Sequence, residues 1–514
     1  MRCFFFSAAN KIQIGADVKK NLLDDIVKWM AKDCRPFAAI SGTGFKSLAQ
    51  AFIKIGAKYG ENVDIDDLLP DETTVSRNLK SWADEKKTEF SSELKKAVEE
   101  TSVAATTDLW TDNYVQRTFL GVTVHYVHNG KKITNRVLGI KSMDFERSTA
   151  DNINIKLRSI FQAFGVDSLD KIMFVTDRGA NICKALENEQ RLNCSSHLFS
   201  NVLEAAFKET ENLGPFINSC KKLVKYFKKA NLQHMLETSL KSHCKTRWNT
   251  HSVMFKSIYD NFDQIKETLE HKDQIEKLQA INYSVLKNLV ALCENFDIIC
   301  KKLQGSNYVT LSFVLPSIQK LKSICEQQPD DLTIISSLKK NVIKQVDKTW
   351  IPNLTIVHKA AVFLYPPLNK HYADDVKQFC ISKMILNYLP STSVSPAEPS
   401  FSREHNFFFS NLISNSTPSA EAAEKEFERY KMTQINISEE FDPIIWWATH
   451  SNEFPKLSKL ALRILSIPAS SADSERIFSL AGNVVNEKRS RLLPKTIDSI
   501  IFLNSFLKNE ILVS

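Results

Sequence analysis

The sequence lacks the features that would mark it as a membrane, disulfide-rich or repeat protein. No window approaches the roughly 20 uninterrupted apolar residues that a bilayer-spanning helix requires, which excludes a membrane-embedded chain. The ten cysteines include no C-x-x-C pair and suggest no disulfide framework, so a reducing compartment is expected. No internal repeat recurs at the period of a solenoid. The opening Met1–Ala9 is at the lower limit of a secretory leader and polar Asn10 follows it, so we expect a protein of the cytosol or nucleus.

Charge is nearly balanced overall but unevenly distributed. In 514 residues, 67 Lys and Arg against 59 Asp and Glu give a net charge of +8, which by itself says little about partners. Between Lys221 and Lys256, nine basic residues accompany a single acidic one, and three aromatic residues are interleaved: Tyr226, Phe227 and Trp248. Such a surface suits phosphate neutralisation and base stacking, although a solvated helix face is the plainer interpretation of a charge run.

The spacing of apolar residues predicts helices first and a small sheet next. Residues 1–80 are expected to be helical, with helices over Val18–Ala31 and Phe45–Tyr59 that are broken by Asp64–Asp71. The next stretch predicts three antiparallel strands, a helix, a fourth strand and a second helix: Val103–Trp110, Thr118–Val127, Ile133–Ser142, Ala150–Phe164, Ile172–Thr176 and Gly179–Leu186. Asn129-Gly130 predicts a hairpin turn between the second and third strands.

From Ser195 onward the pattern is helical for most of the chain. Residues 390–420 are rich in Ser, Pro and Asn, so we expect a disordered or extended surface loop there. The carboxyl region predicts an apolar helix, a break, and a second helix with a capping-box-like start and a glycine end: Leu457–Leu465, Pro468, Ser470 with Asp473, and Gly482.

Two aspartates stand at the ends of predicted strands. Asp108 is near the end of the first strand, and Asp177 follows the fourth. Each aspartate alone could simply cap the following turn, but two at the rim of one sheet supply the hard oxygen ligands with which Mg²⁺ or Mn²⁺ bridges a phosphate. A third carboxylate is then expected. Spacing leaves Glu475 and Asp473 both open, and either could instead compensate the charge of a helix start.

Five segments occur in order along the chain: Asp108–Tyr114, Val175–Asn181, Asn193–Leu198, Thr246–Asn249 and Leu465–Arg491. In this order they closely resemble the hAT superfamily of cut-and-paste DNA transposases, and within it the hobo/Hermes group. The similarity runs from the N-terminal helices to the carboxyl end and weakens in the Ser/Pro-rich loop.

The resemblance implies an α/β plus α fold, in which a large all-helical insertion interrupts a ribonuclease-H-like catalytic core that follows a small N-terminal helical domain. The implied divisions are residues 1–80 for DNA binding or oligomerisation, 81–193 for the first part of the core, 194–455 for the insertion, and 456–514 for completion of the core and dimerisation. The apolar segment Ile497–Leu507, with the N-terminal helices, resembles the family's self-association elements, which implies at least a dimer.

By the same resemblance, Asp108, Asp177 and Glu475 look like the family's catalytic carboxylates, which hold two Mg²⁺ or Mn²⁺ ions. Trp248 matches the insertion-domain aromatic that stacks on a base flipped from flanking DNA, with Arg247 beside it near phosphate, although core packing is the commoner role of a lone tryptophan. The other implied DNA contacts are His197, Arg178, Lys228, Lys229 and Lys245.

Two zinc-binding possibilities are disfavoured by the sequence. Cys194 and His197 form a C-x-x-H pair that the family also carries, but the only nearby pair that could complete a zinc site is His243-Cys244, so a hydrogen-bonding or DNA-contacting His197 is preferred. The N-terminal BED zinc finger typical of the family has no counterpart before Ser102, which leaves recognition of transposon ends open while phosphate contacts remain.

The residues and the resemblance together predict a nuclear transposase that cleaves transposon ends, forms hairpins on the flanking DNA and joins the element's 3′-OH to target DNA. The alternative is a transposase-derived, dimerising DNA-binding protein without transposition activity, which the missing finger favours. A ribonuclease H acting on RNA–DNA hybrids is a weaker third possibility, because such an enzyme needs neither the helical insertion nor the Ile467–Phe478 block.

Overall fold

The computed structural model describes residues 14–60, 62–100, 103–112, 114, 116–128, 130–143, 147–243, 250–370, 374–386, 418–435, 441–485 and 492–511. The chain forms two compact units, Met1–Arg77 and Asn78–Ser514. Within the described residues, no helix combines the length and the apolar character needed to cross a bilayer.

The first unit is helical, as the sequence predicts. Its elements are α1 (Ala16–Asp33), η1 (Phe37–Ser41), α2 (Thr43–Tyr59), α3 (Ile65–Leu68) and the start of α4 (Glu72–Glu100). Trp29 of α1 stacks on Phe45 of α2 with ring centroids 5.4 Å apart. The predicted break at Asp64–Asp71 is only partly correct, because the Asp64 side chain accepts a hydrogen bond from the Asp66 backbone N–H at 2.9 Å and caps the short helix α3.

A five-stranded mixed sheet forms the centre of the second unit. Its strands are β1 (Val103–Thr111), β2 (Thr118–His128), β3 (Lys132–Ser142), β4 (Ile172–Thr176) and β5 (Arg191–Asn193), in the spatial order β3-β2-β1-β4-β5. Neighbours among β1, β2 and β3 are antiparallel, whereas β4 runs parallel to β1 and to β5. The four predicted strands are confirmed. The sequence missed β5 because a strand of 3 residues is too short to show an alternating pattern.

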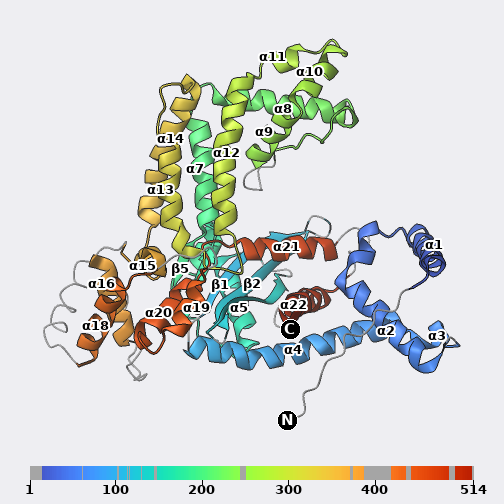
Figure 1. Ribbon diagram of the computed structural model, residues 1–514, viewed down its shortest axis with the longest axis horizontal. Helices are drawn as coiled ribbons and strands as arrows, with labels where there is room; N and C mark the ends of the chain where they lie inside the picture. The colour runs from blue at the N-terminus through green and yellow to red at the C-terminus, as the bar shows by residue number, and fades with distance from the viewer. Residues whose placement is uncertain are drawn as a thin grey trace. The chain divides into compact units, whose positions relative to one another are not determined.

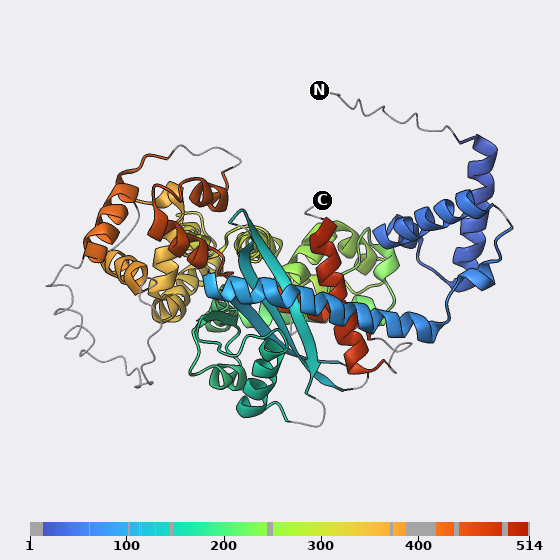
Figure 2. The same ribbon diagram turned by 90° about the horizontal axis from the view of Figure 1, so that it is seen from below.

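Helices cover both faces of the sheet. Along β1, Val103 and Ala105 belong to the core that includes α4 and α5 (Ala150–Gln162), and α6 (Ala180–Ala185) joins the same core. Ala104 points to the opposite core, which includes α7 (Ser195–Glu209) and most of the helical region. Figure 2 shows α4 lying along the sheet on one side. A strand alternates its side chains between two faces, so an all-apolar start of β1 is expected only where both faces are covered.

The last helix, α22 (Pro494–Ile511), packs on the edge strand β3. Its apolar residues Ile497, Ile501, Phe502 and Phe506 are buried within the chain. The Asp498 side chain is only 2% exposed; it accepts hydrogen bonds from the Lys87 and Lys141 ammonium groups at 2.7 and 2.8 Å and from the Ile140 backbone N–H at 2.9 Å. The segment expected to serve self-association therefore also completes this chain's own core.

The remaining elements are helical: α8 (Leu213–Lys229), η2 (Gln233–Met235), α9 (Thr250–Asp260), α10 (Phe262–Glu270), α11 (Glu276–Gln279), α12 (Tyr283–Leu303), η3 (Leu311–Phe313), α13 (Val314–Ile324), α14 (Thr333–Trp350), η4 (Ile351–Asn353), α15 (Ile356–Phe363), η5 (Pro366–Leu368), α16 (Asp374–Leu386), α18 (Pro418–Met432), α19 (Pro443–Thr449), α20 (Pro455–Leu465) and α21 (Ala472–Val484). Figure 1 shows α7, α12, α13 and α14 side by side, in agreement with their contacts.

Two buried polar side chains fix helix starts in this region. The Glu426 carboxylate, on α18, accepts hydrogen bonds from the backbone N–H groups of Lys456 and Leu457 at 2.9 and 2.6 Å, which caps α20. His358 completes a capping box at the start of α15: its Nδ1 accepts from the Thr355 backbone N–H at 3.2 Å. Burial lowers the pKa of His358 to about 4, so the ring is neutral in the folded chain at neutral pH.

The structure corrects two predictions near the carboxyl end. The predicted capping box does not form at the start of α21: Ser470 Oγ accepts a hydrogen bond from the Ala472 backbone N–H at 3.2 Å, but the N-cap position is Ser471 and Asp473 is bonded to Ser306. Gly482 does not end α21, which continues to Val484, because this turn packs near Trp110 of β1 and burial outweighs glycine's low helix propensity. Most of the loop expected at 390–420 lies outside the described residues, and α18 already begins at Pro418.

Candidate active site

The sheet brings Asp108 and Asp177 to the same edge. β1 and β4 are parallel neighbours with Thr106 opposite Val175, and the two aspartates stand equally far beyond this pair. Asp108 is still within β1, and Asp177 begins the turn after β4. Because parallel strands end at the same edge of a sheet, their carboxylates approach each other.

Asp108 is the most strongly perturbed carboxylate at this edge. Burial, together with the negative charges of Asp177 and Glu475, raises the pKa of Asp108 from 3.8 to about 7, against lowering contributions from the Leu109 N–H and from His197. The Leu109 backbone N–H donates to Asp108 Oδ1 at 2.7 Å. A carboxylate in this environment is stabilised as an anion by a neighbouring cation.

The turn that holds Asp177 is built around an arginine. Asp177 Oδ1 accepts from the Gly179 backbone N–H at 3.1 Å. Arg191, on β5, donates to Thr176 Oγ1 at 3.2 Å, to the Asp177 carbonyl at 3.3 Å and to Asn193 Oδ1 at 2.8 Å. Sequence reasoning did not single out Arg191, and the only signal for it was its place just before the Asn193–Leu198 segment.

Helix α21 carries Glu475 to the same edge through an aromatic contact. Phe478, on the next turn of α21, stacks on Trp110 of β1 with ring centroids 6.0 Å apart and an interplanar angle of 17°. The ring lies over Gly121, which is the partner of Asp108 in the β1–β2 ladder. A Cβ atom on Gly121 would lie 2.9 Å from Phe478 Cε1, so the close approach of α21 requires glycine.

The structure separates the two acidic residues at the start of α21. Glu475 Oε1 lies 3.8 Å from His197 Nε2, and the Glu475 charge acts on Asp108. Asp473 instead accepts a hydrogen bond from Ser306 Oγ at 2.6 Å and pairs with Arg476, and its other oxygen lies 3.7 Å from the buried His125. Asp473 therefore anchors α21 to the loop after α12, while Glu475 faces the aspartates.

The start of α7 joins these parts of the chain. The Cys194 backbone N–H donates to the Thr176 carbonyl at 2.7 Å, and the Ser195 N–H donates to the Ala469 carbonyl at 2.8 Å. The Cys194 sulfur accepts from the Ser471 backbone N–H at 3.3 Å. Cys194 thus makes hydrogen bonds that tie β4, α7 and the approach to α21 together, and His197 projects from the first turn of α7 toward Glu475.

The carboxylate oxygens of Asp108, Asp177 and Glu475 lie farther apart than the ligand atoms of a single bound ion. Within the described ranges, three other side chains, Glu204, His243 and His251, do have potential ligand atoms that all lie within 4.8 Å of one another. Asp108, Asp177 and Glu475 interact electrostatically at longer range. The three carboxylates would have to move closer together to bind a shared cation.

Some of the predicted DNA-contacting residues lie in the described part of the chain and others lie outside it. Arg178 is exposed and follows Asp177 directly, and Lys228 and Lys229 are exposed at the end of α8, where Lys228 donates to Ser242 Oγ at 2.8 Å. Lys245, Arg247 and Trp248 lie outside the described residues. Of the described residues in this set, His197 lies 3.8 Å from Glu475, and Arg178 is the chain neighbour of Asp177.

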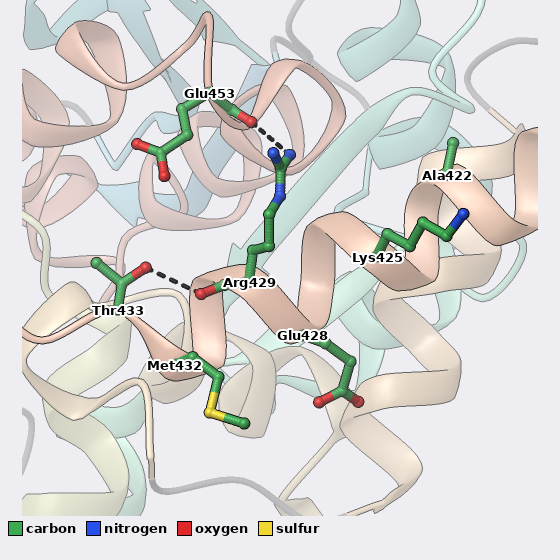
Figure 3. Close-up of a pocket in the computed structure, with 7 residues that line it drawn as sticks. All are labelled: Ala422, Lys425, Glu428, Arg429, Met432, Thr433 and Glu453. Atoms are coloured by element: carbon green, nitrogen blue, oxygen red, sulfur yellow. Dashed lines mark hydrogen bonds between the residues drawn. The ribbon is translucent and has the colours of Figure 1, made fainter.

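A pocket in the carboxyl-terminal region contains none of these residues. Figure 3 shows it lined mainly by α18, with Arg429 donating to the Glu453 carbonyl at 2.8 Å and the Thr433 hydroxyl donating to the Arg429 carbonyl at 3.0 Å. Its lining joins α18 to the loop before α20 and has no part in the carboxylate site.

Comparison with known proteins identifies the family. Residues 420–507 match the hAT family C-terminal dimerisation region, and residues 9–74 match the Hermes transposase DNA-binding domain. The chain is 44% identical over 510 residues to the Transposable element Hobo transposase of Drosophila melanogaster, covering 90% of this chain and 78% of that protein. The chain therefore belongs to the hAT family of transposases, and within it is similar to the Hobo and Hermes proteins.

More distant relatives carry other names. Human Zinc finger protein 618 is 20% identical over 95% of this chain, and human Zinc finger BED domain-containing protein 4 is 21% identical over 95% of it. The chain spans 51% and 43% of the lengths of those two proteins. The matched regions for DNA binding and dimerisation identify DNA and a second subunit as partners of this chain.

Proposed function

We propose that this protein is a cut-and-paste DNA transposase that uses Asp108, Asp177 and Glu475 as its catalytic carboxylates. The observation behind the proposal is that Asp108 and Asp177 stand at the ends of adjacent parallel strands and that the charges of Asp177 and Glu475 both act on Asp108. The 44% identity to Hobo transposase supports the same function. We further propose that the protein acts in the nucleus on transposon ends, flanking DNA and target DNA.

The topology supports a ribonuclease-H-like core. Three antiparallel strands are followed by two strands parallel to the first, in the order β3-β2-β1-β4-β5, with helices on both faces. The helical insertion enters after β5, and the chain returns through α21 to complete the site. This arrangement explains why the third carboxylate lies so far along the sequence from the first two.

The donor set fits divalent cations such as Mg²⁺ or Mn²⁺. Asp108, Asp177 and Glu475 offer carboxylate oxygens, the ligands that hard cations prefer. Burial and the repulsion from the other two carboxylates raise the pKa of Asp108, and a bound cation would offset both effects. When bound, two such ions supply Lewis-acid activation of the attacking oxygen and of the scissile phosphate. The number of ions and the formation of hairpins on the flanking DNA are part of the proposal.

The chain's own residues would orient the DNA around this edge. His197, 3.8 Å from Glu475, is placed to orient that carboxylate or to contact a phosphate oxygen. Arg178, exposed beside Asp177, is placed to bind a phosphate of the cleaved strand. The exposed Lys228 and Lys229 would add sequence-independent contacts, whose strength falls as salt rises.

A second candidate function is that of a transposase-derived protein that dimerises and binds DNA without transposing. The observation behind it is that two human proteins similar to 95% of this chain carry zinc finger names rather than the name transposase. The two functions make different predictions for the carboxylates, because a binding protein does not need them.

The test is an in vitro cleavage and joining reaction with transposon-end DNA and Mn²⁺. We expect hairpin and strand-transfer products from the unaltered chain, and a fall of more than about 100-fold in Asp108→Asn, Asp177→Asn and Glu475→Gln, as expected when metal ligands are lost. Asp473→Asn is the matched control: it lies on the same turn, keeps an oxygen that can accept from Ser306, and should retain cleavage. Products that persist in Glu475→Gln would contradict its role, and DNA binding without products under any metal would favour the second function.

A further inference from the structure

A second cluster of metal-binding side chains lies apart from the three carboxylates. Glu204 is on α7, His251 is in the first turn of α9, and His243 precedes the segment that leads into α9. Their ligand atoms, one carboxylate oxygen and two imidazole nitrogens, all lie within 4.8 Å of one another. The two imidazole rings stack with centroids 3.8 Å apart.

Hydrogen bonding alone does not account for this cluster. His251 is buried, and its Nδ1 lies 2.6 Å from Glu204 Oε1. That contact satisfies Nδ1, but His251 Nε2 is also buried and has no hydrogen-bond partner among the residues that the structure describes. The rings of Phe207 and Phe255 pack against the imidazole of His251, with ring centroids 5.5 and 6.0 Å away, and their side chains have no polar atom. Buried polar atoms without a partner are rare in folded proteins and call for an explanation.

We propose that Glu204, His243 and His251 bind a zinc ion. Two imidazoles and one carboxylate are a set of ligands that zinc accepts, whereas Mg²⁺ prefers oxygen ligands alone. With metal–ligand bonds of about 2.0–2.2 Å, tetrahedral zinc holds its ligand atoms roughly 3.3 Å apart, which the observed spacing accommodates. The Glu204 side chain is 44% exposed and that of His251 is 6% exposed, so the ion has an open side where water can supply the fourth ligand.

The charges around the cluster are compatible with a bound cation. Besides Glu204, the carboxylate of Asp297 on α12 lies beside α9, where it accepts a hydrogen bond from Ser252 Oγ at 2.9 Å. Two lysines belong to the same helices: Lys208 of α7 acts electrostatically on Glu204, and Lys256 of α9 is paired with Glu294 at 2.8 Å. The acidic groups Glu204 and Asp297 thus offset the positive charge of Lys208 around the two imidazoles.

The placement gives the ion a structural role. His243 comes immediately before residues 244–249, and His251 comes just after them. A zinc ion would join both positions to α7, the helix whose first turn carries His197. The zinc ion would therefore fix where this part of the helical insertion starts. None of its three ligands is a proposed catalytic residue.

The test measures zinc bound by the purified full-length chain after dialysis against ZnCl₂ with excess MgCl₂, using elemental analysis. We expect about one zinc per chain, and a loss of affinity of about 100-fold or more in His243→Ala, Glu204→Ala and His251→Gln, since even changes around a ligand cost 10–100-fold. The matched control is His234→Ala, an exposed histidine of the same region, which should bind zinc as the unaltered chain does. Cobalt substitution should give visible absorption that the same variants lose.

Each outcome decides the proposal. If the unaltered chain binds no zinc, or if His243→Ala and Glu204→Ala bind it with unchanged affinity, the proposal is overturned. Zinc that is lost only in Cys194→Ser would place the ion elsewhere and would also overturn it. Circular dichroism identifies any variant that fails to fold. If the variant of buried His251 does not fold, His243→Ala decides the proposal, because His243 is partly exposed. Asp108→Asn should keep its zinc, so failure of this proposal is distinguishable from failure of the proposed transposase activity.

Discussion

The contact between Gly121 and Phe478 should control where Glu475 stands. In Gly121→Ala, the new Cβ would lie 2.9 Å from Phe478 Cε1 and 3.1 Å from Cζ, whereas ordinary contacts begin at 3.4 Å. The ring must therefore retreat by about 0.5 Å, since overpacked side chains relieve such contacts by shifting. Phe478 is on the turn after Glu475, so α21 and the carboxylate are expected to move with it.

The size of both effects follows from this displacement. Overpacking of a buried contact costs about 1–3 kcal/mol, so the free energy of unfolding should fall by roughly that amount. Misplacement of a catalytic group by about 1 Å can cost about 100-fold in rate, so a shift of half that size is expected to lower cleavage by roughly 10-fold. The loss of activity should thus exceed what the loss of stability explains.

The assay compares Gly121→Ala, Phe478→Leu and the double variant in urea unfolding and in DNA cleavage. Phe478→Leu removes the ring atoms that the new methyl meets, so the double variant should recover stability, with a coupling of about 1–2 kcal/mol, and part of the activity. The control is Gly214→Ala in α8, where a Cβ meets nothing within 4 Å. It should raise stability slightly, by up to about 1 kcal/mol, through helix propensity.

Two results would refute this reasoning. Equal stability and cleavage in Gly121→Ala and the unaltered chain would mean that α21 is not held by this contact. Strict additivity of Gly121→Ala and Phe478→Leu would mean that the two side chains do not meet. Either result would remove the packing argument for the position of Glu475.

Three further predictions concern stability and are measured by urea unfolding. Asp498→Ala leaves two lysines and a backbone N–H without their buried acceptor and should cost about 2–3 kcal/mol; a loss near zero would contradict it. Glu426→Ala uncaps α20 and should cost about 1–3 kcal/mol, whereas Glu426→Gln should cost less. Because the pKa of His358 is about 4 when folded and 6.5 ordinarily, the free energy of unfolding should fall by about 1.4 kcal/mol per unit as pH drops from 6.5 toward 4. His358→Leu should abolish that slope.

Much of the fold could be predicted from the sequence because its elements carry local patterns. The strands β1 to β4 and the helices α1, α2, α5 and α20 appear where apolar periodicity places them. The errors arise where tertiary contacts override local signals. Ser470 and Asp473 suggested a capping box, but Asp473 is bonded to Ser306 and Ser470 accepts from the Ala472 N–H instead; Gly482 suggested a helix end that packing near Trp110 prevents.

The candidate site could be predicted only in part. Asp108 and Asp177 were accessible because strand ends are visible in the sequence and parallel neighbours end together. Spacing could not choose between Glu475 and Asp473, since both stand in the first turn of one helix. Their different directions, toward His197 and toward Ser306, depend on how α21 packs.

The cluster of Glu204, His243 and His251 escaped sequence reasoning altogether. Its three residues follow no metal-binding spacing, and the sequence drew attention to His243 only as part of the His243-Cys244 pair, in a zinc site with Cys194 and His197 that it disfavoured. The structure places His243 against His251 and Glu204 instead. Convergence of this kind depends on how α7 and α9 pack, which local patterns do not encode.

The amino-acid sequence was sufficient for the family, for the first four strands and for the two aspartates at strand ends, because short segments of the chain carry these signals. It pointed to Glu475 through the family resemblance, whereas the different directions of Glu475 and Asp473 and the meeting of Glu204 with two histidines are seen only in the folded chain. The physical reason is that side-chain direction depends on the packing of whole helices, as with Phe478 over Gly121, and that packing joins residues hundreds of positions apart.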